Sequence, residues 1–395
     1  MIKFISTFRF FDFNVVLLFT IFHSFFRYVF NIVFYNFASM KKISKVFICL
    51  FLVHFSFAQK YSNEFLNIGV GARALGMANS IIASTNDVTA GYWNPSALLL
   101  QKNNIEVGLM HAEYFAGIAK YDYLGVSKII DSNSVGAISI LRFGIDNIPN
   151  TLDLVDPNGN VDYSRISYFG ATDLAVLFSY ARKIPQLKGI LLGGNFKVIN
   201  RKIGPFAKAW GFGLDVSASY HYHNWRVAAI AKDITGTYNA WSFSFTDDEK
   251  EVLLSTGNSI PKNSLEITRP SLILGIARTW SFKKDFSLTA EANFYNTFDG
   301  KRNTVIKTNL WSLEPRMGIE LGYKNLIFVR TGIGNIQKQL NPEGTSYITT
   351  FQPNIGAGIH YKIITIDYAL SDVGNKSIAP YSNIFSLRVD LNPKK

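Results

Sequence analysis

Charged residues and cysteine are both scarce in this chain of 395 residues. Only 17% of the residues are charged, while 48% are apolar and 15% are aromatic; soluble domains carry about a quarter charged residues. The single cysteine, Cys49, excludes a disulfide framework and a thiolate metal site. After the N-terminal region, no apolar run reaches the roughly 18 residues that a membrane-spanning helix needs. Dispersed apolar content favours a β-barrel, whose strands carry it on alternate residues.

The basic residues are in excess, but they form no cluster. The formal charge is +12, from 40 basic and 28 acidic residues. Residues 1–58 hold 6 of the basic and 1 of the acidic residues, which leaves 34 and 27 and a charge of +7 for the remainder. Scattered cations argue against a nucleic-acid partner. No serine or cysteine stands in a nucleophile motif, so the sequence indicates neither an enzyme nor a cofactor.

The N-terminal region contains a complete export signal that begins at Met40. Three lysines precede an apolar stretch over 46–55, and Ser56-Phe57-Ala58 forms a small-x-small cleavage site. We therefore expect a signal peptide over 40–58, cleaved after Ala58. Two interpretations of residues 1–39 remain: an incorrectly annotated upstream extension, which we favour, or a membrane anchor over 13–37.

From about residue 104 onward, apolar and polar residues alternate with a period of two. In Phe286–Tyr295, for example, Phe, Leu and Ala alternate with Ser, Thr, Glu and Asn. The alternation predicts strands over 104–114, 119–129, 133–144, 171–183, 188–200, 208–221, 224–233, 268–281, 285–295, 311–323, 325–334, 351–361, 363–370 and 382–391. A soluble sandwich remains the alternative. Strand lengths near the 9–11 residues of a tilted membrane strand favour an all-β, transmembrane antiparallel barrel of about 14 strands over 104–395.

The connections predicted between these strands alternate between short turns and long loops. The long loops are 145–170, 234–267, 296–310, 335–350 and 371–381, and all of them follow odd-numbered strands. Outer-membrane barrels have short periplasmic turns and long outer loops. The pattern therefore predicts the cell outer membrane as location and its lipid as a partner.

Residues 59–103 precede the first predicted strand and read differently. Gly69 to Ala74 fits the dinucleotide-binding pattern G-x-G-x-x-A, but that pattern has meaning only between a strand and a helix of a βαβ unit. In an otherwise all-β chain we discount nucleotide binding. We also discount a zinc site at His221 and His223, which lack a third nearby ligand, and a calcium loop over 156–162, whose glycine is misplaced.

This segment resembles the N-terminal signature of the PorV/PorQ family, which belongs with FadL-like fourteen-stranded barrels. The matching stretches are Phe65–Gly69, Gly71–Met77, Asp87, Ala90 and Tyr92–Pro95, together with Asp367–Ala369 and Phe385–Leu387 near the C-terminus. The chain departs from the family at Ala78-Asn79, at Ser96 and in its last five residues. The resemblance implies a plug inside the barrel, with Gly69, Gly71, Arg73, Gly76, Asp87, Trp93, Asn94 and Pro95 as its motif. Arg73 is expected to pair with an inward carboxylate such as Asp215 or Glu291.

The resemblance also implies a function, namely an accessory of the type IX secretion system. Such a barrel handles or presents cargo at the cell surface, so its partners would be secretion components and cargo C-terminal domains. The predicted outer loops offer Tyr163, Arg165, Tyr168, Tyr238 and Trp241 as partner contacts. Two alternatives remain open: a FadL-like transporter of hydrophobic small molecules, and a purely structural porin.

Overall fold

The structure is a computed structural model that describes residues 62–393, apart from 156–159, 284, 342–343 and 378–380. The predicted upstream extension (1–39), the signal peptide (40–58) and the cleavage after Ala58 lie outside the described residues. No helix within the described ranges is long and apolar enough to cross a bilayer.

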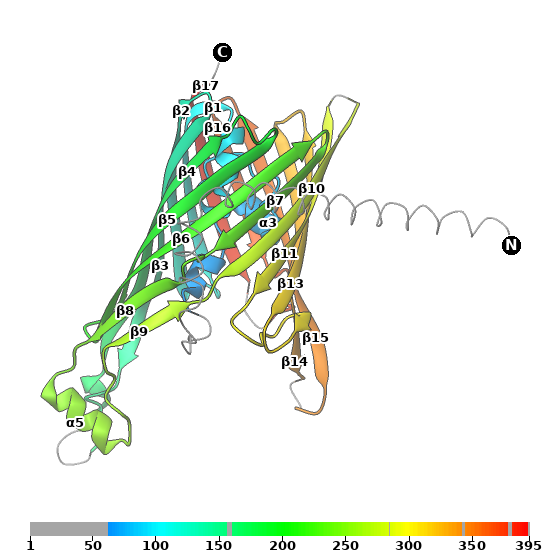
Figure 1. The fold of residues 1–395 in the computed structure, drawn as a ribbon. Helices are drawn as coiled ribbons and strands as arrows, with labels where there is room; N and C mark the ends of the chain where they lie inside the picture. Colours follow the sequence, from blue (N-terminus) through cyan, green and yellow to red (C-terminus); the bar gives the residue numbers. More distant parts are fainter. Residues whose placement is uncertain (1–61, 156–159, 284, 342–343, 378–380, 394–395) are drawn as a thin grey trace. The chain divides into compact units, whose positions relative to one another are not determined.

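Almost all of the described chain after residue 102 forms β-strands, which run obliquely around a ring (Figure 1). The segments are β1 (Asn103–Tyr114), β2 (Ala119–Asp131), β3 (Ser134–Asn150), β4 (Ser167–Lys183), β5 (Ile190–Ile203), β6 (Ala207–Tyr222), β7 (Trp225–Lys232), β8 (Thr237–Phe243), β9 (Ser264–Thr268), β10 (Ser271–Phe282), β11 (Phe286–Thr297), β12 (Ile306–Lys307), β13 (Ser312–Tyr323), β14 (Ile327–Leu340), β15 (Tyr347–Tyr361), β16 (Ile364–Ser371) and β17 (Ser382–Pro393). Each predicted strand corresponds to one of these segments.

The strands pair with their antiparallel neighbours and the ring closes where β1 pairs with β17. β7 and β8 both pair with β6, while β10 and β9 pair with β7 and β8 in turn. β7 and β8 are therefore two parts of one interrupted strand, and so are β9 and β10. β12 is a two-residue addition to β13. The described residues thus form a closed barrel of fourteen strands, which confirms the predicted fold class.

The two faces of the wall follow the predicted alternation. On β6 the outward Trp210 and Phe212 are 55% and 51% exposed, whereas the inward Ala209 and Asp215 are 1% and 3% exposed. An apolar outer face and a mixed inner face are the arrangement of a membrane barrel, in which lipid replaces water around the wall.

The long connections all lie at one end of the barrel, which we call the long-loop end. Strands continue further into the predicted loops 145–170 and 234–267 than alternation indicated, since β3 reaches Asn150 and β8 and β9 cover 237–243 and 264–268. Backbone pairing continues there without apolar alternation, because ladder hydrogen bonds do not need it. The remaining loop 244–263 contains helix α5 (Asp247–Ser255), which projects past the strands (Figure 1).

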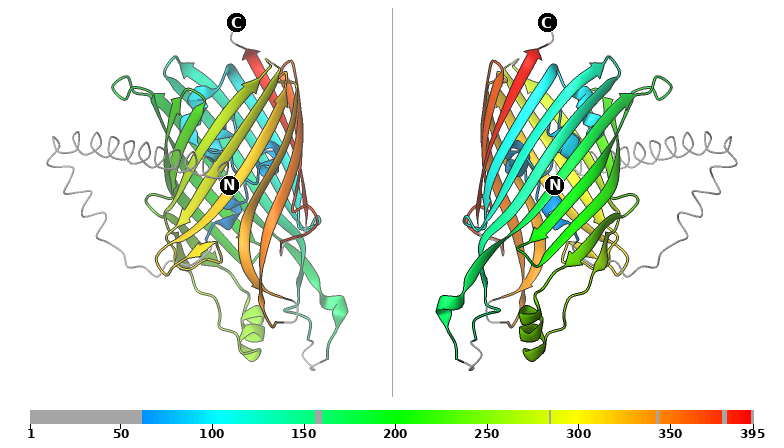
Figure 2. Two further views of the ribbon diagram at one scale, coloured as in Figure 1. Left: turned by 90° about the vertical axis from the view of Figure 1, so that its right-hand side faces the viewer. Right: turned by 90° about the vertical axis from the view of Figure 1, so that its left-hand side faces the viewer.

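Residues 62–102, the N-terminal segment, lie within the ring of strands in every view (Figures 1 and 2). The segment forms short helices η1 (Glu64–Asn67), α3 (Ala72–Gly76), α4 (Ala90–Trp93) and η2 (Pro95–Leu100). Its apolar residues, Trp93, Met77 and Ile82 among them, are almost fully buried. The main core of the protein therefore lies between this segment and the inner wall.

Close backbone approach to the wall requires glycine at several strand positions. At Gly332 on β14, an added Cβ would overlap the backbone of Met77 and Ala78. We expect Gly332→Ala to displace the N-terminal segment and to lower the unfolding free energy by about 1–3 kcal/mol, the usual cost of overpacking. Urea unfolding in detergent, with limited proteolysis of the segment, measures both effects.

The matched control is Gly136→Ala on β3, where the added Cβ would lie 3.4 Å from the Ile130 side chain, at ordinary contact distance. Equal stability and equal protease resistance of the Gly332→Ala and Gly136→Ala proteins would contradict the close contact between the N-terminal segment and β14.

Candidate functional site

An ion-pair network joins the N-terminal segment to the inner wall at Arg73. Arg73 donates from Nε and Nη2 to both carboxylate oxygens of Glu320 on β13, at 2.8 and 3.0 Å. Arg330 on β14 donates to the same Glu320 at 2.7 Å and to Asp367 on β16 at 2.6 Å. Two arginines and two carboxylates thus balance one another in a place where an unpaired charge would be costly.

The predicted partners of Arg73, Asp215 and Glu291, are both wrong. Asp215 pairs instead with Lys197 at 2.8 Å. Glu291 accepts hydrogen bonds from the backbone N–H groups of Ala83 and Ser84, at 2.7 and 2.9 Å. Each of these carboxylates already satisfies another buried donor, so neither is available to Arg73.

A second network holds the segment at Asp87. Its carboxylate accepts a hydrogen bond from Arg388 on β17 at 2.9 Å and caps the Thr89 backbone N–H at 2.9 Å. The next backbone N–H, that of Val88, donates to Glu106 on β1. Carboxylates of the segment and of the wall therefore take the place that a neighbouring strand would have for these backbone groups.

The remaining motif residues fold the segment on itself. Gly69 and Gly71 have positive φ values of 106° and 86°, which suit glycine. The Trp93 indole N–H donates to the Val70 carbonyl at 2.9 Å, and Asn94 donates to the Ile82 carbonyl at 2.7 Å. Gly76 lies against Gly356, and Pro95 begins η2. All eight predicted motif residues thus belong to one folded unit in the lumen.

An open apolar cavity of about 310 Å³ lies at the long-loop end; we call it the mouth cavity. Ile203, Ala207 and Phe243, which line it, stand on the inward-facing register of their strands. The other lining residues are Pro149, Asn150, Thr151, Leu152, Phe169, Phe206 and Phe245. Phe206 contacts Phe169 edge-to-face and stacks on Phe245, with ring centroids 5.1 and 5.8 Å apart. Such a surface binds apolar molecules in preference to polar ones.

Aromatic contacts continue from the mouth cavity to the N-terminal segment. Phe243 stacks on Trp241, with ring centroids 6.1 Å apart. The Arg201 guanidinium lies 5.1 Å from the Trp241 ring and 6.0 Å from the ring of Phe65, which belongs to η1. Arg201 is itself paired with Asp173 and Glu266. The cavity and the segment are therefore linked by contacts between named side chains.

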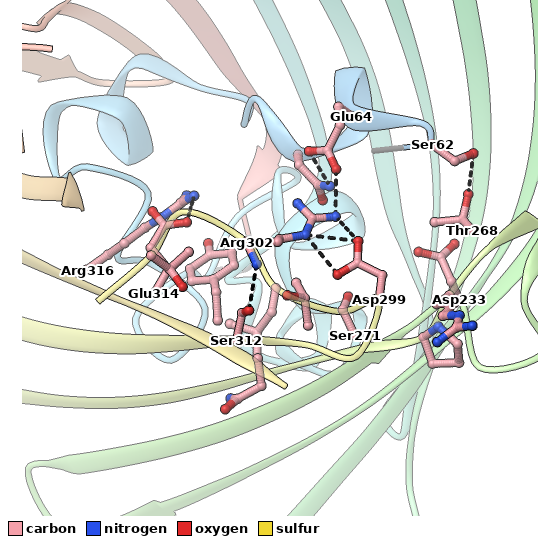
Figure 3. Close-up of a pocket in the computed structure, with 18 residues that line it drawn as sticks. Ser62, Glu64, Asp233, Thr268, Ser271, Asp299, Arg302, Ser312, Glu314 and Arg316 are labelled. Carbon is pink, nitrogen blue, oxygen red and sulfur yellow. Dashed lines mark hydrogen bonds and ion pairs between the residues drawn. The ribbon is translucent and has the colours of Figure 1, made fainter. Parts of the chain in front are cut away.

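A smaller polar pocket of about 90 Å³ lies beside η1, between loop 298–311 and the wall (Figure 3). Arg302 of the loop pairs with Asp299 and also with Glu64 of η1, at 2.9 Å. Partial burial opposes the charge of Arg302, but Asp299 and Glu64 outweigh it and raise the guanidinium pKa above its usual value. The loop is thereby tied to the N-terminal segment.

The five predicted partner contacts do not form one surface. Tyr163 and Arg165 lie in the short helix η3 (Tyr163–Arg165), and Tyr168 is exposed on the adjoining β4. Tyr238 is 42% exposed on the outer face of β8, while Trp241 faces inward and donates to Glu266. An odd spacing along a strand places Tyr238 and Trp241 on opposite faces.

The two histidines that were discounted as a zinc site also separate. His223 stands in the turn after β6 with φ 52° and its ring contacts that of Tyr222, whereas His221 remains on β6. Within the described residues no group of three or more His, Cys, Asp or Glu side chains could hold a metal.

Sequence reasoning did not identify the phenylalanines of the mouth cavity. Phe169, Phe206, Phe243 and Phe245 come from three separate parts of the chain and share no spacing. Glu320 and Arg330 were visible only as charges on an inward-facing register, and nothing in the sequence matched them to Arg73.

Comparison with known proteins supports the fold and leaves the family undecided. No known family profile matches this chain, and no curated protein is similar to it in sequence. Two solved structures, the CymD monoaromatic hydrocarbon channel and the P. putida toluene transporter TodX, are 13% and 12% identical to it, each with a TM-score of 0.50. The matches cover 82% of this chain and 98% or 99% of the other.

Identity this low establishes a shared fold and no shared activity. The class of protein is thus a closed fourteen-stranded barrel with the fold of these hydrocarbon channels. The FadL-like fold expected from the sequence is confirmed, and the narrower resemblance to PorV/PorQ stays a prediction.

The Arg73 network yields a stability prediction. Glu320→Gln removes the carboxylate that both arginines share, so we expect the unfolding free energy to fall by about 3–5 kcal/mol, the range for breaking a buried ion pair. Urea unfolding in detergent measures the loss. Glu251→Gln on the exposed face of α5 is the control and should change little. Similar values for the two variants would refute the role assigned to Glu320.

Proposed function

We propose that this protein is an outer-membrane transporter that takes up small hydrophobic molecules from outside the cell. The observation that carries the proposal is the mouth cavity, an open apolar hollow at the end of the barrel where the long loops lie. Burying apolar surface contributes about 25 cal/mol per Å². The free energy of a hydrophobic solute therefore falls when it leaves water for this cavity.

The lumen beyond the cavity supports selective passage rather than open diffusion. The N-terminal segment lies across it, and Arg73, Asp87 and Arg302 take part in the ion pairs that join it to the wall or to loop 298–311. Passage then requires a local shift of this segment. Of the solved structures with the same fold, CymD is a monoaromatic hydrocarbon channel and TodX is a toluene transporter.

Filling the mouth cavity tests this function. Ala207 is 6% exposed and lines the cavity, so a tryptophan at this position occupies the space that a ligand would take. We expect Ala207→Trp to lower the rate of toluene uptake by cells that express the protein by about tenfold, equivalent to about 1.4 kcal/mol. Ala240→Trp, on the exposed face of β8, is the matched control. Uptake that is equal in both variants would remove the cavity from the proposal.

A second function, an accessory role in type IX secretion, rests on the sequence motif of the N-terminal segment. The exposed surfaces available to cargo would be residues 151–155 and 160–166 and the loop that carries α5. If the role is correct, replacing residues 246–258 with a Gly-Ser linker should reduce surface display of cargo that carries the secretion C-terminal domain. Toluene uptake by the same variant serves as the control for folding. Full cargo display together with normal uptake would count against the secretion role.

A further inference from the structure

Three charged side chains face outward from the barrel wall in one row across β1, β2 and β3. His111 is directly opposite Asp122, and Asp122 is directly opposite Arg142. His111 Nδ1 lies 2.7 Å and Arg142 Nη1 lies 3.3 Å from the Asp122 carboxylate. Their side chains are 51%, 40% and 43% exposed. We call these three residues the rim triad, because β1 ends three residues after His111, at the long-loop end.

The position of the triad on the wall is unusual for charged groups. His111 is three residues from the end of β1 and Trp210 is three residues from the start of β6, both at the long-loop end. Trp210 is an outward aromatic residue of the kind that marks a membrane interface. A charge on the lipid face costs about 2–4 kcal/mol at mid-membrane and about 0–1 kcal/mol near the interface. The triad therefore belongs at the level of the lipid headgroups.

A groove of about 610 Å³ adjoins the triad on the outer wall. His111, Asp122 and Arg142 form its polar end. Most of the remaining lining consists of the outward apolar side chains Leu109, Leu124, Ile140, Ile366, Phe385 and Leu387. A charged end next to an apolar hollow fits a molecule with an ionic head and a hydrocarbon tail.

The donors of the triad favour an anionic head. Among the described residues Arg142 makes one long hydrogen bond, to Asp122, so a guanidinium with five N–H donors retains most of them for a further acceptor. Asp122 already accepts from both His111 and Arg142, which leaves it little attraction for an added cation. Arginine is the side chain best suited to phosphate, because its planar fork donates two parallel hydrogen bonds.

We propose that the rim triad and its groove form a binding site for one anionic phospholipid-type molecule of the surrounding membrane. The phosphate is bound by Arg142, and an acyl chain lies along Leu124 and Ile140. Lys120 beside the triad pairs with Asp146 at 3.3 Å and is directly opposite Glu113, so the positive charge for the head comes from Arg142. This site lies outside the lumen, so it is independent of the proposed transport.

Lipid retention on the purified full-length barrel tests the proposal. The protein in detergent is incubated with phosphatidylglycerol, with phosphatidylcholine of the same acyl chains, or with inorganic phosphate, and bound molecules are counted by native mass spectrometry. We expect one retained phosphatidylglycerol, held about tenfold more tightly than phosphatidylcholine. Arg142→Gln should remove this preference, and Ile140→Trp, which fills the groove, should weaken retention of both lipids.

Arg278→Gln is the matched control, because Arg278 is another arginine on the outer wall, stacked on Trp225 and Trp280. It should retain phosphatidylglycerol as the unaltered protein does. Each variant is first checked for folding by its resistance to unfolding in cold detergent. Equal retention of the two lipids by the unaltered protein, or unchanged preference in Arg142→Gln, would overturn the proposal. Tight binding of inorganic phosphate alone would also overturn it, since the groove would then be irrelevant.

Discussion

The structure depends on how polar groups are satisfied inside a closed ring of fourteen strands. A ring of this size is too wide for the side chains of the wall to fill alone, in contrast to an eight-stranded barrel. The N-terminal segment occupies the space, but much of it is irregular, so many of its backbone N–H groups need partners from outside. Inward carboxylates and amides such as Glu291, Glu106 and Asn293 supply those partners. Segment and wall therefore form one core.

The same requirement determines where charge is found. Arg73, Arg330 and Arg388 are each paired with carboxylates, because a buried charge without a partner would destabilise the fold. Two of these pairs, Arg73 with Glu320 and Arg388 with Asp87, join positions more than two hundred residues apart in the chain. The barrel must close before they can form. The networks consequently couple the seating of the segment to the closure of the wall.

The two faces of the wall separate two kinds of chemistry. Inside, aromatic side chains at the long-loop end leave an apolar hollow. Contacts from Phe243 in this hollow continue through Trp241 and Arg201 to Phe65. Outside, the apolar belt is interrupted at the rim triad, where charged side chains adjoin an apolar groove. Alternation along a strand allows both surfaces to be built by neighbouring residues of one chain, since successive side chains point to opposite faces.

The sequence by itself determined the barrel, because period-two alternation and strand length are local properties that can be read along the chain; all fourteen strands were found at nearly their observed places. It also identified residues 59–103 as a distinct segment and Arg73 as needing a carboxylate. Only the tertiary structure decided that this carboxylate is Glu320, that Phe169, Phe206 and Phe243 meet at one cavity, and that Tyr238 and Trp241 face apart. Pairings between distant strands depend on register and on bulges such as that between Gly334 and Gln337 on β14, and no local pattern in the sequence records them.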